Sequence, residues 1–433
     1  MNASVNDYPR AVAGDFLGLE FPPTLETLHD QGTAFLTRAF HVCGTLDLEN
    51  RVTEVTEEAE FFGGGMGRKL LLSLEYEKPA AGLQKQLFVK LQLDFGNPLR
   101  GVFGPLMQAE VRFALLSRRD EFPIVVPKCY FADFNAATGS GILITERIFY
   151  GENGIEARYE KCLDYRIANP LAHYQAMTRS MAKLAGFHKA GKFGATVAHE
   201  FPWDPTKIDA GNRIPYGPRE LREKLDKVRE FCNAYPQLMP ANLCSSSFLD
   251  GVCRDLPLLL EYETDIRAYI NSRVDYVALC HWNMNLDNAW FWTDAHGALQ
   301  VGLLDWGSVG QMNIGQAFYG MTCCAELDLL NTHRRSLMEM LVAEYRANGG
   351  PQIELEELMF LHKLGVVLLG VAFVLDAPSL IEGQVPELYA VTDRFDPRIA
   401  DNFLGRVELQ ILAVFLNEWQ VGDIGAALRK FAG

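Results

Sequence analysis

Residues 281–288 read His-Trp-Asn-Met-Asn-Leu-Asp-Asn, and residues 302–306 read Gly-Leu-Leu-Asp-Trp. Asn288 ends the first stretch, a compact polar loop, and Asp305 ends an apolar strand-like stretch 17 residues later. Both side chains offer hard oxygen ligands, and magnesium is held by a few protein oxygens together with substrate phosphates. The pair is therefore a candidate magnesium site. Taken singly, each residue is more often structural, Asn288 as a turn residue and Asp305 as a cap.

A glycine run, FFGGGMGRK, occupies residues 61–69. It is not a Walker A loop, because Arg68 and Lys69 follow Gly67 where that motif requires Lys and then Ser or Thr. It is not a dinucleotide fingerprint either, because a strand-like stretch follows it instead of a helix. Two interpretations stay open: a plain hairpin turn, or a loop whose backbone N–H groups cover phosphates.

Lys90 lies inside the apolar stretch LFVKLQ, and Glu110 lies 20 residues later in an amphipathic segment. A lysine in a buried strand is costly unless its charge is paired, and a glutamate on a neighbouring helix is a suitable partner. Such a pair could hold the ammonium over nucleotide phosphates. The alternative is an edge-strand lysine that points to water.

The first 150 residues have the pattern of strands, and the remainder has mainly the pattern of helices. Among the predicted strands, at 70–76, 86–92 and 141–148, we expect one helix at 105–119. The helices expected later in the chain are 172–190, 218–235, 262–272, 315–348, 354–375 and 401–431, with a small hairpin of 289–292 and 300–304 among them. The sequence therefore predicts two lobes, residues 1–148 and 149–433, in an α+β fold.

Composition excludes several function classes. The 433 residues carry 40 Lys and Arg against 55 Asp and Glu, a net charge of −15, which argues against a nucleic-acid partner. Nine cysteines without a C-x-x-C pair and a start without a secretory signal indicate a cytoplasmic protein. The longest apolar run, Leu364–Leu375, is short of the ~20 residues of a membrane span, so we expect no membrane role.

These motifs resemble the family of aminoglycoside phosphotransferases, choline kinases and ecdysteroid-kinase-like proteins. Its catalytic loop reads H-G-D-x-x-x-x-N and its later metal motif I-D-W or I-D-F, matched here by His281, Asn283, Asn288 and Leu304-Asp305-Trp306. The resemblance covers roughly residues 50 to 320 in motifs. It implies a bilobal protein-kinase-like fold, with an antiparallel-sheet N-lobe and a mostly helical C-lobe, which uses ATP or another nucleoside triphosphate with magnesium.

The resemblance also implies roles for single residues. Asn288 and Asp305 would bind magnesium, His281 would brace the catalytic loop, and Asn283 stands at the catalytic position. The nucleotide would be bound by Gly63, Gly65 and Gly67 over the phosphates, by Lys90 oriented by Glu110, and by the backbone from Glu146 to Ile148 at adenine.

One departure affects the chemistry. Asn283 stands where the family has an aspartate that accepts the proton of the acceptor hydroxyl, and an amide cannot accept it as a carboxylate can. Three interpretations follow: a small-molecule kinase acting on a hydroxyl group, a nucleotide-binding pseudokinase, or another chemistry such as nucleotidyl transfer. Asp287 is the nearest carboxylate; it adjoins the metal ligand, which favours a loop hydrogen bond or a contact behind the ligand over a role as substitute base. Trp282 either narrows the acceptor site or packs beneath the loop. The acidic net charge favours a neutral or cationic hydroxyl compound as acceptor.

Overall fold

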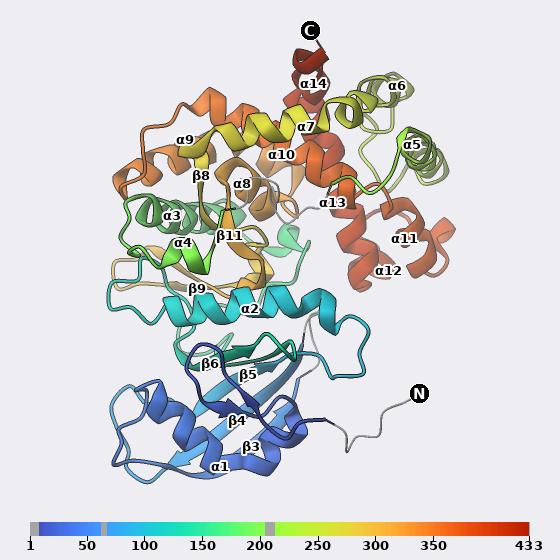
Figure 1. Cartoon of the computed structure of the whole chain (residues 1–433). Coiled ribbons are helices and arrows are strands. Elements are labelled where there is room, and N and C mark those ends of the chain that lie inside the picture. The colour runs from blue at the N-terminus through green and yellow to red at the C-terminus, as the bar shows by residue number, and fades with distance from the viewer. Residues whose placement is uncertain (1–7, 62–66, 204–212, 433) are drawn as a thin grey trace. The chain divides into compact units, whose positions relative to one another are not determined.

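The computed structural model describes residues 8–61, 67–203 and 213–432, and the chain divides into two compact units (Figure 1). Unit 1 comprises Met1–Asn153 with Gly302–Val309, and unit 2 comprises Gly154–Val301 with Gly310–Gly433. The sequence predicts a single boundary between the two lobes, after residue 148. In the structure, the short segment Gly302–Val309 also belongs to unit 1. The predicted α+β class is confirmed, because unit 1 is built on an antiparallel sheet and unit 2 is mostly helical.

Unit 1 contains a five-stranded antiparallel sheet in the order β3-β4-β5-β7-β6. Strand β5 is central, and Lys90 in it pairs with Lys69 on one side and Leu143 on the other. The edge-strand alternative for Lys90 is therefore excluded. The strands of unit 1 are β1 Val12–Ala13, β2 Glu20–Phe21, β3 Val52–Glu60, β4 Arg68–Tyr76, β5 Gln86–Leu91, β6 Cys129–Asn135 and β7 Ser140–Glu146.

Two helices cover the sheet of unit 1, α1 (Leu25–Val42) and α2 (Arg100–Leu116). The apolar residues of α1 pack with one set of strand side chains, which includes Val89 and Leu91, and those of α2 pack with a separate set. Because alternate residues of a strand face opposite sides, Lys90 lies on the face that α2 covers. This placement brings Lys90 to the helix that carries Glu110.

Helix α1 corrects the sequence prediction, which expected a single helix among the first 150 residues. It begins at the N-cap Thr24, where the Thr27 N–H donates to the Thr24 hydroxyl and the Thr24 N–H to the Thr27 hydroxyl, at 3.3 and 3.1 Å. Gly32, with φ = +45°, interrupts the helical backbone. That kink shifts the phase of the apolar pattern, which explains why one continuous helical period is not visible. Helix α2 likewise begins at Arg100, before the Pro105 at which the sequence prediction started it.

Unit 2 is organised around the buried helix α10, which contacts α7, α8, α9, α13 and α14. Its strands, β8 Val277–His281, β9 Ala289–Thr293, β10 Leu299–Leu303 and β11 Val309–Asn313, form the two-stranded pairs β9-β10 and β8-β11, and β10 leads into the segment that joins unit 1. The helices are α3 Pro170–Lys189, α4 Val197–Glu200, α5 Pro218–Ala234, α6 Ser246–Asp255, α7 Pro257–Ser272, α8 Ile314–Thr322, α9 Leu327–Ala347, α10 Leu355–Phe373, α11 Ala377–Gln384, α12 Pro397–Ala400, α13 Phe403–Gly422 and α14 Ile424–Ala432.

Two segments predicted as single helices are each broken. The segment 315–348 forms α8 and α9, and the segment 401–431 forms α13 and α14. The second break lies at Asp423, whose φ of +49° is left-handed and ends a helix. At the first break, Asn285 donates its amide N–H to the carbonyls of Gly320 and Met321, at 2.7 and 3.4 Å. The last carbonyls of a helix have no partner within it, so this side chain caps the end of α8.

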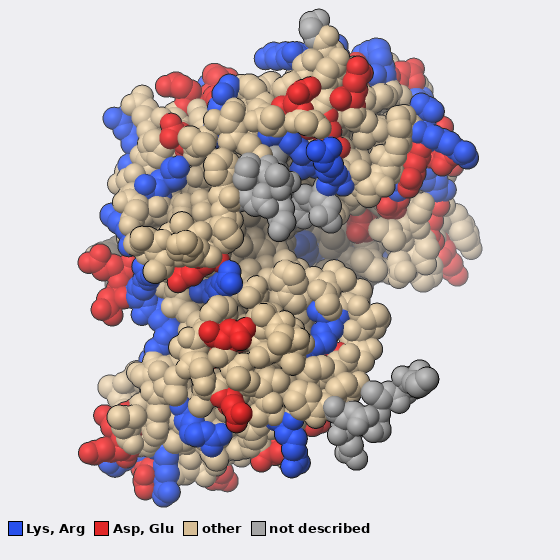
Figure 2. Space-filling view, viewed as in Figure 1, with Lys and Arg blue, Asp and Glu red and all other residues tan. Residues whose placement is uncertain are grey.

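Charge and hydropathy complete the description. Acidic and basic side chains are interspersed over the face drawn in Figure 2. Within the described part of the chain, no single helix has the length and hydropathy to cross a membrane, and α10 and α11 meet those criteria only as a pair bent by 47°.

Candidate active site

Lys90 is the centre of the polar arrangement in unit 1. Its Nζ lies 2.6 Å from Glu110 Oε2 and 3.0 Å from Asp305 Oδ1. The side chains of Lys90 and Glu110 are only 6% and 7% exposed. Burial lowers the pKa of Lys90, but the two carboxylates outweigh it and raise that pKa above its ordinary value. Lys90 is therefore a buried, protonated donor, and the ion pair with Glu110 that the sequence suggested is present.

Asp305 adopts a left-handed backbone conformation, with φ = +62° and ψ = +59°. This conformation costs a residue with a side chain roughly 1–2 kcal/mol, and such strain is often found at functional sites. Its neighbour Trp306 keeps the segment in place: the indole stacks on Phe113 with ring centroids 3.8 Å apart and donates to the Leu303 carbonyl at 3.1 Å. Glu110 and Phe113 lie about one turn apart on α2, so one helix positions both acids around Lys90.

A small pocket of unit 1 opens beside this lysine. Gly67 has φ = +80°, and a Cβ placed on it would collide with the carbonyl oxygen of Leu91. Only glycine fits there, so the backbone of Gly67 can approach the pocket closely. Gly63 and Gly65 lie outside the described residues. The pocket is lined by Gly67, Lys90, Gln92, Phe103, Met107 and Glu110.

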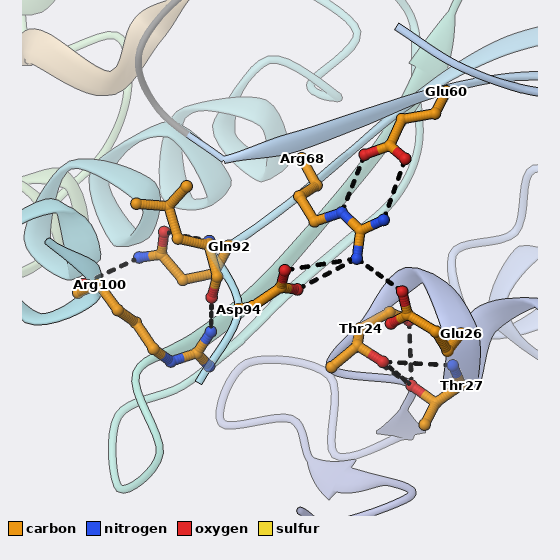
Figure 3. A network of polar contacts seen from close by, with 9 residues as sticks. Thr24, Glu26, Thr27, Glu60, Arg68, Gln92, Asp94 and Arg100 are labelled. Carbon is orange, nitrogen blue, oxygen red and sulfur yellow. Dashed lines mark hydrogen bonds and ion pairs between the residues drawn. The ribbon is translucent and has the colours of Figure 1, made fainter. Parts of the chain in front are cut away.

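Arg68 is engaged by three acids and cannot serve as a free phosphate-binding cation (Figure 3). Its guanidinium donates twice to Glu60, at 2.9 and 3.0 Å, once to Glu26 at 2.7 Å and twice to Asp94, at 3.2 and 3.5 Å. The hydrogen bonds that Arg68 donates to Glu60, together with the other acids, raise the pKa of Arg68. Because Glu60 ends β3 and Arg68 begins β4, this pair joins the two strands on either side of residues 61–67.

The segment expected at adenine follows strand β7. The Glu146 N–H donates to the Lys128 carbonyl at 2.9 Å, and the Glu146 carboxylate accepts the Lys128 N–H at 2.8 Å. Both groups of Glu146 thus connect β7 to residues before β6. Ile148 lies just beyond β7 in a segment without regular structure.

In unit 2, the loop after β8 is fixed by its own polar side chains. His281, the last residue of β8, accepts the Asn283 N–H at Nδ1, 3.3 Å away. Asn288 donates its amide N–H to the Asn283 carbonyl at 2.9 Å. This contact uses the amide nitrogen of Asn288, so its oxygen is the atom that could bind a cation. His281 thus contacts the loop, and its bracing role stays a prediction.

Lys161 is a functional candidate that the sequence analysis missed. Its Nζ donates to Asn285 Oδ1 at 2.6 Å and to Asn283 Oδ1 at 3.2 Å. Burial lowers the pKa of Lys161, but negative neighbours, among them Cys324 and Asp287, raise it overall. No sequence signal marks Lys161, which lies in a loop 122 positions before Asn283.

Trp282 packs against helix α8. A Cβ on Gly320 would collide with the Trp282 carbonyl and lie 3.0 Å from its ring atom Cε3. The sequence left open whether this tryptophan narrows the acceptor site or packs beneath the loop. The contact with α8 favours the second interpretation, in which Trp282 supports the loop. Among the residues described, no group of three or more His, Cys, Asp or Glu side chains could hold a metal ion.

Comparisons with known proteins find a set of similar solved structures, and three of them illustrate the likeness. No family model and no curated protein sequence matches the chain. The microcompartment-associated aminopropanol kinase is 13% identical, with a TM-score of 0.40 over 90% of this chain and 98% of that chain. Plasmodium vivax ethanolamine kinase is 11% identical, with a TM-score of 0.37 over 82% of this chain and 81% of that chain. Spectinomycin phosphotransferase in complex with ADP and spectinomycin is 10% identical (TM-score 0.38; 87% and 94%). By name, all three are kinases or phosphotransferases of small molecules.

Proposed function

We propose that the protein is a phosphotransferase that uses ATP, or another nucleoside triphosphate, with magnesium to phosphorylate a small molecule. The observation that carries this proposal is the ammonium of Lys90, buried in a central strand and held by Glu110 and Asp305. A structural ion pair needs one acid. A second acid in a strained backbone conformation indicates a site where charge is kept ready for a ligand.

The charges around Lys90 suit a nucleotide with its metal ion. One ammonium faces two carboxylates, so the group carries an excess negative charge that a bound cation would neutralise. Phosphate oxygens would in turn be attracted to the ammonium of Lys90. Magnesium needs only a few protein oxygens, and Asp305 and the amide oxygen of Asn288 are the ligands proposed for it. When bound, the ion would neutralise charge on the transferring phosphoryl group. The backbone of Gly67 and the ammonium of Lys90 would hold the phosphates.

A hydroxyl group of a small molecule is the acceptor that the resemblance implies. Asn283 would lie next to it and orient it. A second candidate function, a nucleotide-binding pseudokinase, is favoured by one observation: the amide oxygen of Asn283 already accepts a hydrogen bond from Lys161. Both functions require nucleotide binding at Lys90, and only the first requires turnover.

Thermal-shift titration with ATP, with and without magnesium, tests the shared requirement. A ligand at 100 times its Kd stabilises the folded protein by about 2.7 kcal/mol, so wild type is expected to show a clear shift with ATP and magnesium. Asp305→Asn removes the charge but keeps a residue type that tolerates left-handed backbone. This variant is expected to lose the magnesium-dependent part of the shift.

Asp226→Asn is the matched control, because Asp226 is exposed on α5. It is expected to keep the wild-type response. Absence of any shift with ATP and magnesium would contradict both candidate functions, and an unchanged magnesium response in Asp305→Asn would remove Asp305 from the metal site. Release of ADP then separates the kinase from the pseudokinase.

A further inference from the structure

The amide orientation of Asn283 is determined by Lys161. An ammonium group has only donors, so the atoms that face it at 3.2 and 2.6 Å must be the amide oxygens of Asn283 and Asn285. The carbonyl of Asn283 is therefore directed at a cation. The other polar group of its side chain is an NH₂ group, which can only donate.

The lysine is held in this position from several sides. Asn285 is buried, with its amide nitrogen on the Gly320 carbonyl at the end of α8, so its oxygen presents a fixed acceptor to Lys161. The Lys161 carbonyl accepts the Nε–H of Arg406 at 3.0 Å, which fixes the backbone on the other side. Asn283 and Lys161 are themselves only partly buried, so a ligand in solvent can reach them.

Because of these contacts, the side chain of Asn283 cannot act as a general base. An amide oxygen is a very weak base, and a hydrogen bond from an ammonium makes it weaker still. An alcohol loses a proton when it is phosphorylated, whereas a carboxylate, with an ordinary pKa near ~4, arrives ionised at neutral pH. The NH₂ group of Asn283 and the remaining N–H of Lys161 are donors that match carboxylate oxygens.

Building on the proposed phosphotransferase function, we propose that the acceptor is the carboxylate of a small molecule and that the product is an acyl phosphate. One carboxylate oxygen forms a bond to the γ-phosphorus, and the bond from that phosphorus to the bridging oxygen breaks. The electron pair leaves on the nucleoside diphosphate, and no proton is transferred.

This inference replaces the hydroxyl acceptor that the resemblance implies, and with it the neutral or cationic compound that the net charge favours. The net charge of −15 is spread over the whole chain, and at physiological ionic strength charges more than about 8 Å apart are largely screened. The groups that surround Asn283 therefore decide which acceptor binds, and they are donors.

Matched acceptor pairs test the acceptor class directly. ADP release by the full chain with ATP and magnesium is measured for propionate against 1-propanol, β-alanine against 3-aminopropanol, and benzoate against benzyl alcohol. Hydroxylamine is added to trap any acyl phosphate as a hydroxamate. At least one carboxylate is expected to stimulate ADP release about tenfold or more over its alcohol, with a matching yield of hydroxamate and a rate that is flat from about pH 6 to 8.

Faster release with the alcohol of every stimulating pair would overturn the inference while the phosphotransferase function stands. A protein that ATP stabilises but that no carboxylate stimulates would overturn it as well. If ATP causes no thermal shift, the proposed function fails first, and the inference fails with it.

Two variants separate a positioning role from a structural one. Asn283→Asp places a carboxylate beside Lys161 that repels an anionic acceptor and can accept a proton, so the preference is expected to move toward alcohols. Lys161→Met is expected to raise the KM for the carboxylate about tenfold, and Lys161→Arg, which keeps the charge and donors, to retain most of the wild-type KM. A loss of stability alone would lower every rate together and leave the preference unchanged, which would contradict the inference.

Discussion

Lys90 is the residue whose replacement has the most direct consequence for stability. Its ammonium is the shared partner of Glu110 and Asp305, so Lys90→Met leaves a buried carboxylate without a cation. Breaking a buried pair in this way costs about 3–5 kcal/mol. We expect Lys90→Met to lower the free energy of unfolding in urea by that amount, and to abolish the thermal shift with ATP.

Lys85 provides a matched control in the same strand region. It pairs with Glu75 at 2.6 Å, but both side chains are nearly half exposed. An exposed pair contributes at most about 1 kcal/mol, so Lys85→Met is expected to have a small effect and to leave the ATP response intact. Equal losses in the two variants would mean that Lys90 is not buried as described.

Single residues also show how far the sequence determines the site. The pairing of Lys90 with Glu110 was predictable because an apolar strand and an amphipathic helix lie close in sequence, and a buried charge needs a partner. The contact of Asp305 with Lys90 was not, since it joins residues 215 positions apart. Lys161 lay beyond prediction for the same reason: its loop has no periodicity, and its partners come from another part of the chain.

Helix α8 is the element that supports the loop after β8. Gly320 allows the helix to approach Trp282 closely, and its carbonyl accepts the amide of Asn285. Gly320→Ala would drive a Cβ into the Trp282 backbone, and overpacking of this kind costs about 1–3 kcal/mol. We expect this loss in urea unfolding, together with reduced ADP release because Asn283 lies in the displaced loop.

Gly383, exposed in α11, is the matched control for this substitution. Nothing lies within 4 Å of a Cβ placed on it. Alanine has the higher helix propensity, so Gly383→Ala is expected to stabilise the protein by up to about 1 kcal/mol. A neutral or stabilising Gly320→Ala would show that the loop and α8 are not tightly packed.

At the level of elements, helices were predicted well where one apolar period continues and poorly where it is interrupted. Helix α1 was missed because Gly32 changes its phase, and α8 was merged with α9 because the break between them is made by Asn285, a residue outside the segment. A side chain that caps a helix from elsewhere in the chain leaves no mark in the local pattern. The hairpin of β9 and β10 was found because its turn residues are local.

The stability of the whole molecule depends on pH through the buried carboxyl group of Asp164. Burial raises the pKa of Asp164 to about 7, and the Tyr174 hydroxyl, which donates to its carboxylate at 2.6 Å, only partly opposes this. In the unfolded chain the pKa is near ~4. A raised folded-state pKa gives a stability contribution that is complete below about pH 4 and lost as pH rises through about 7.

Asp164→Asn removes this titration. We expect the free energy of unfolding of the variant, relative to that of wild type, to rise by roughly 2–4 kcal/mol from pH 5 to pH 8. Urea unfolding at both pH values measures this change. Asp226→Asn should stay within about 0.5 kcal/mol of wild type at each pH, since it changes an exposed surface position. A constant difference between Asp164→Asn and wild type across this range would contradict the assignment.

The inclusion of Gly302–Val309 in unit 1 has a consequence for synthesis on the ribosome. The strands and helices of residues 12–146 emerge first. At that stage Trp306, which stacks on Phe113, and Asp305, the second acid at Lys90, have not yet been synthesised. At about 5–20 residues per second, synthesis of residues 154–301 takes roughly 7–30 s. For that time Phe113 lacks the indole of Trp306 as its stacking partner, so we expect this protein to depend on chaperones that bind nascent chains.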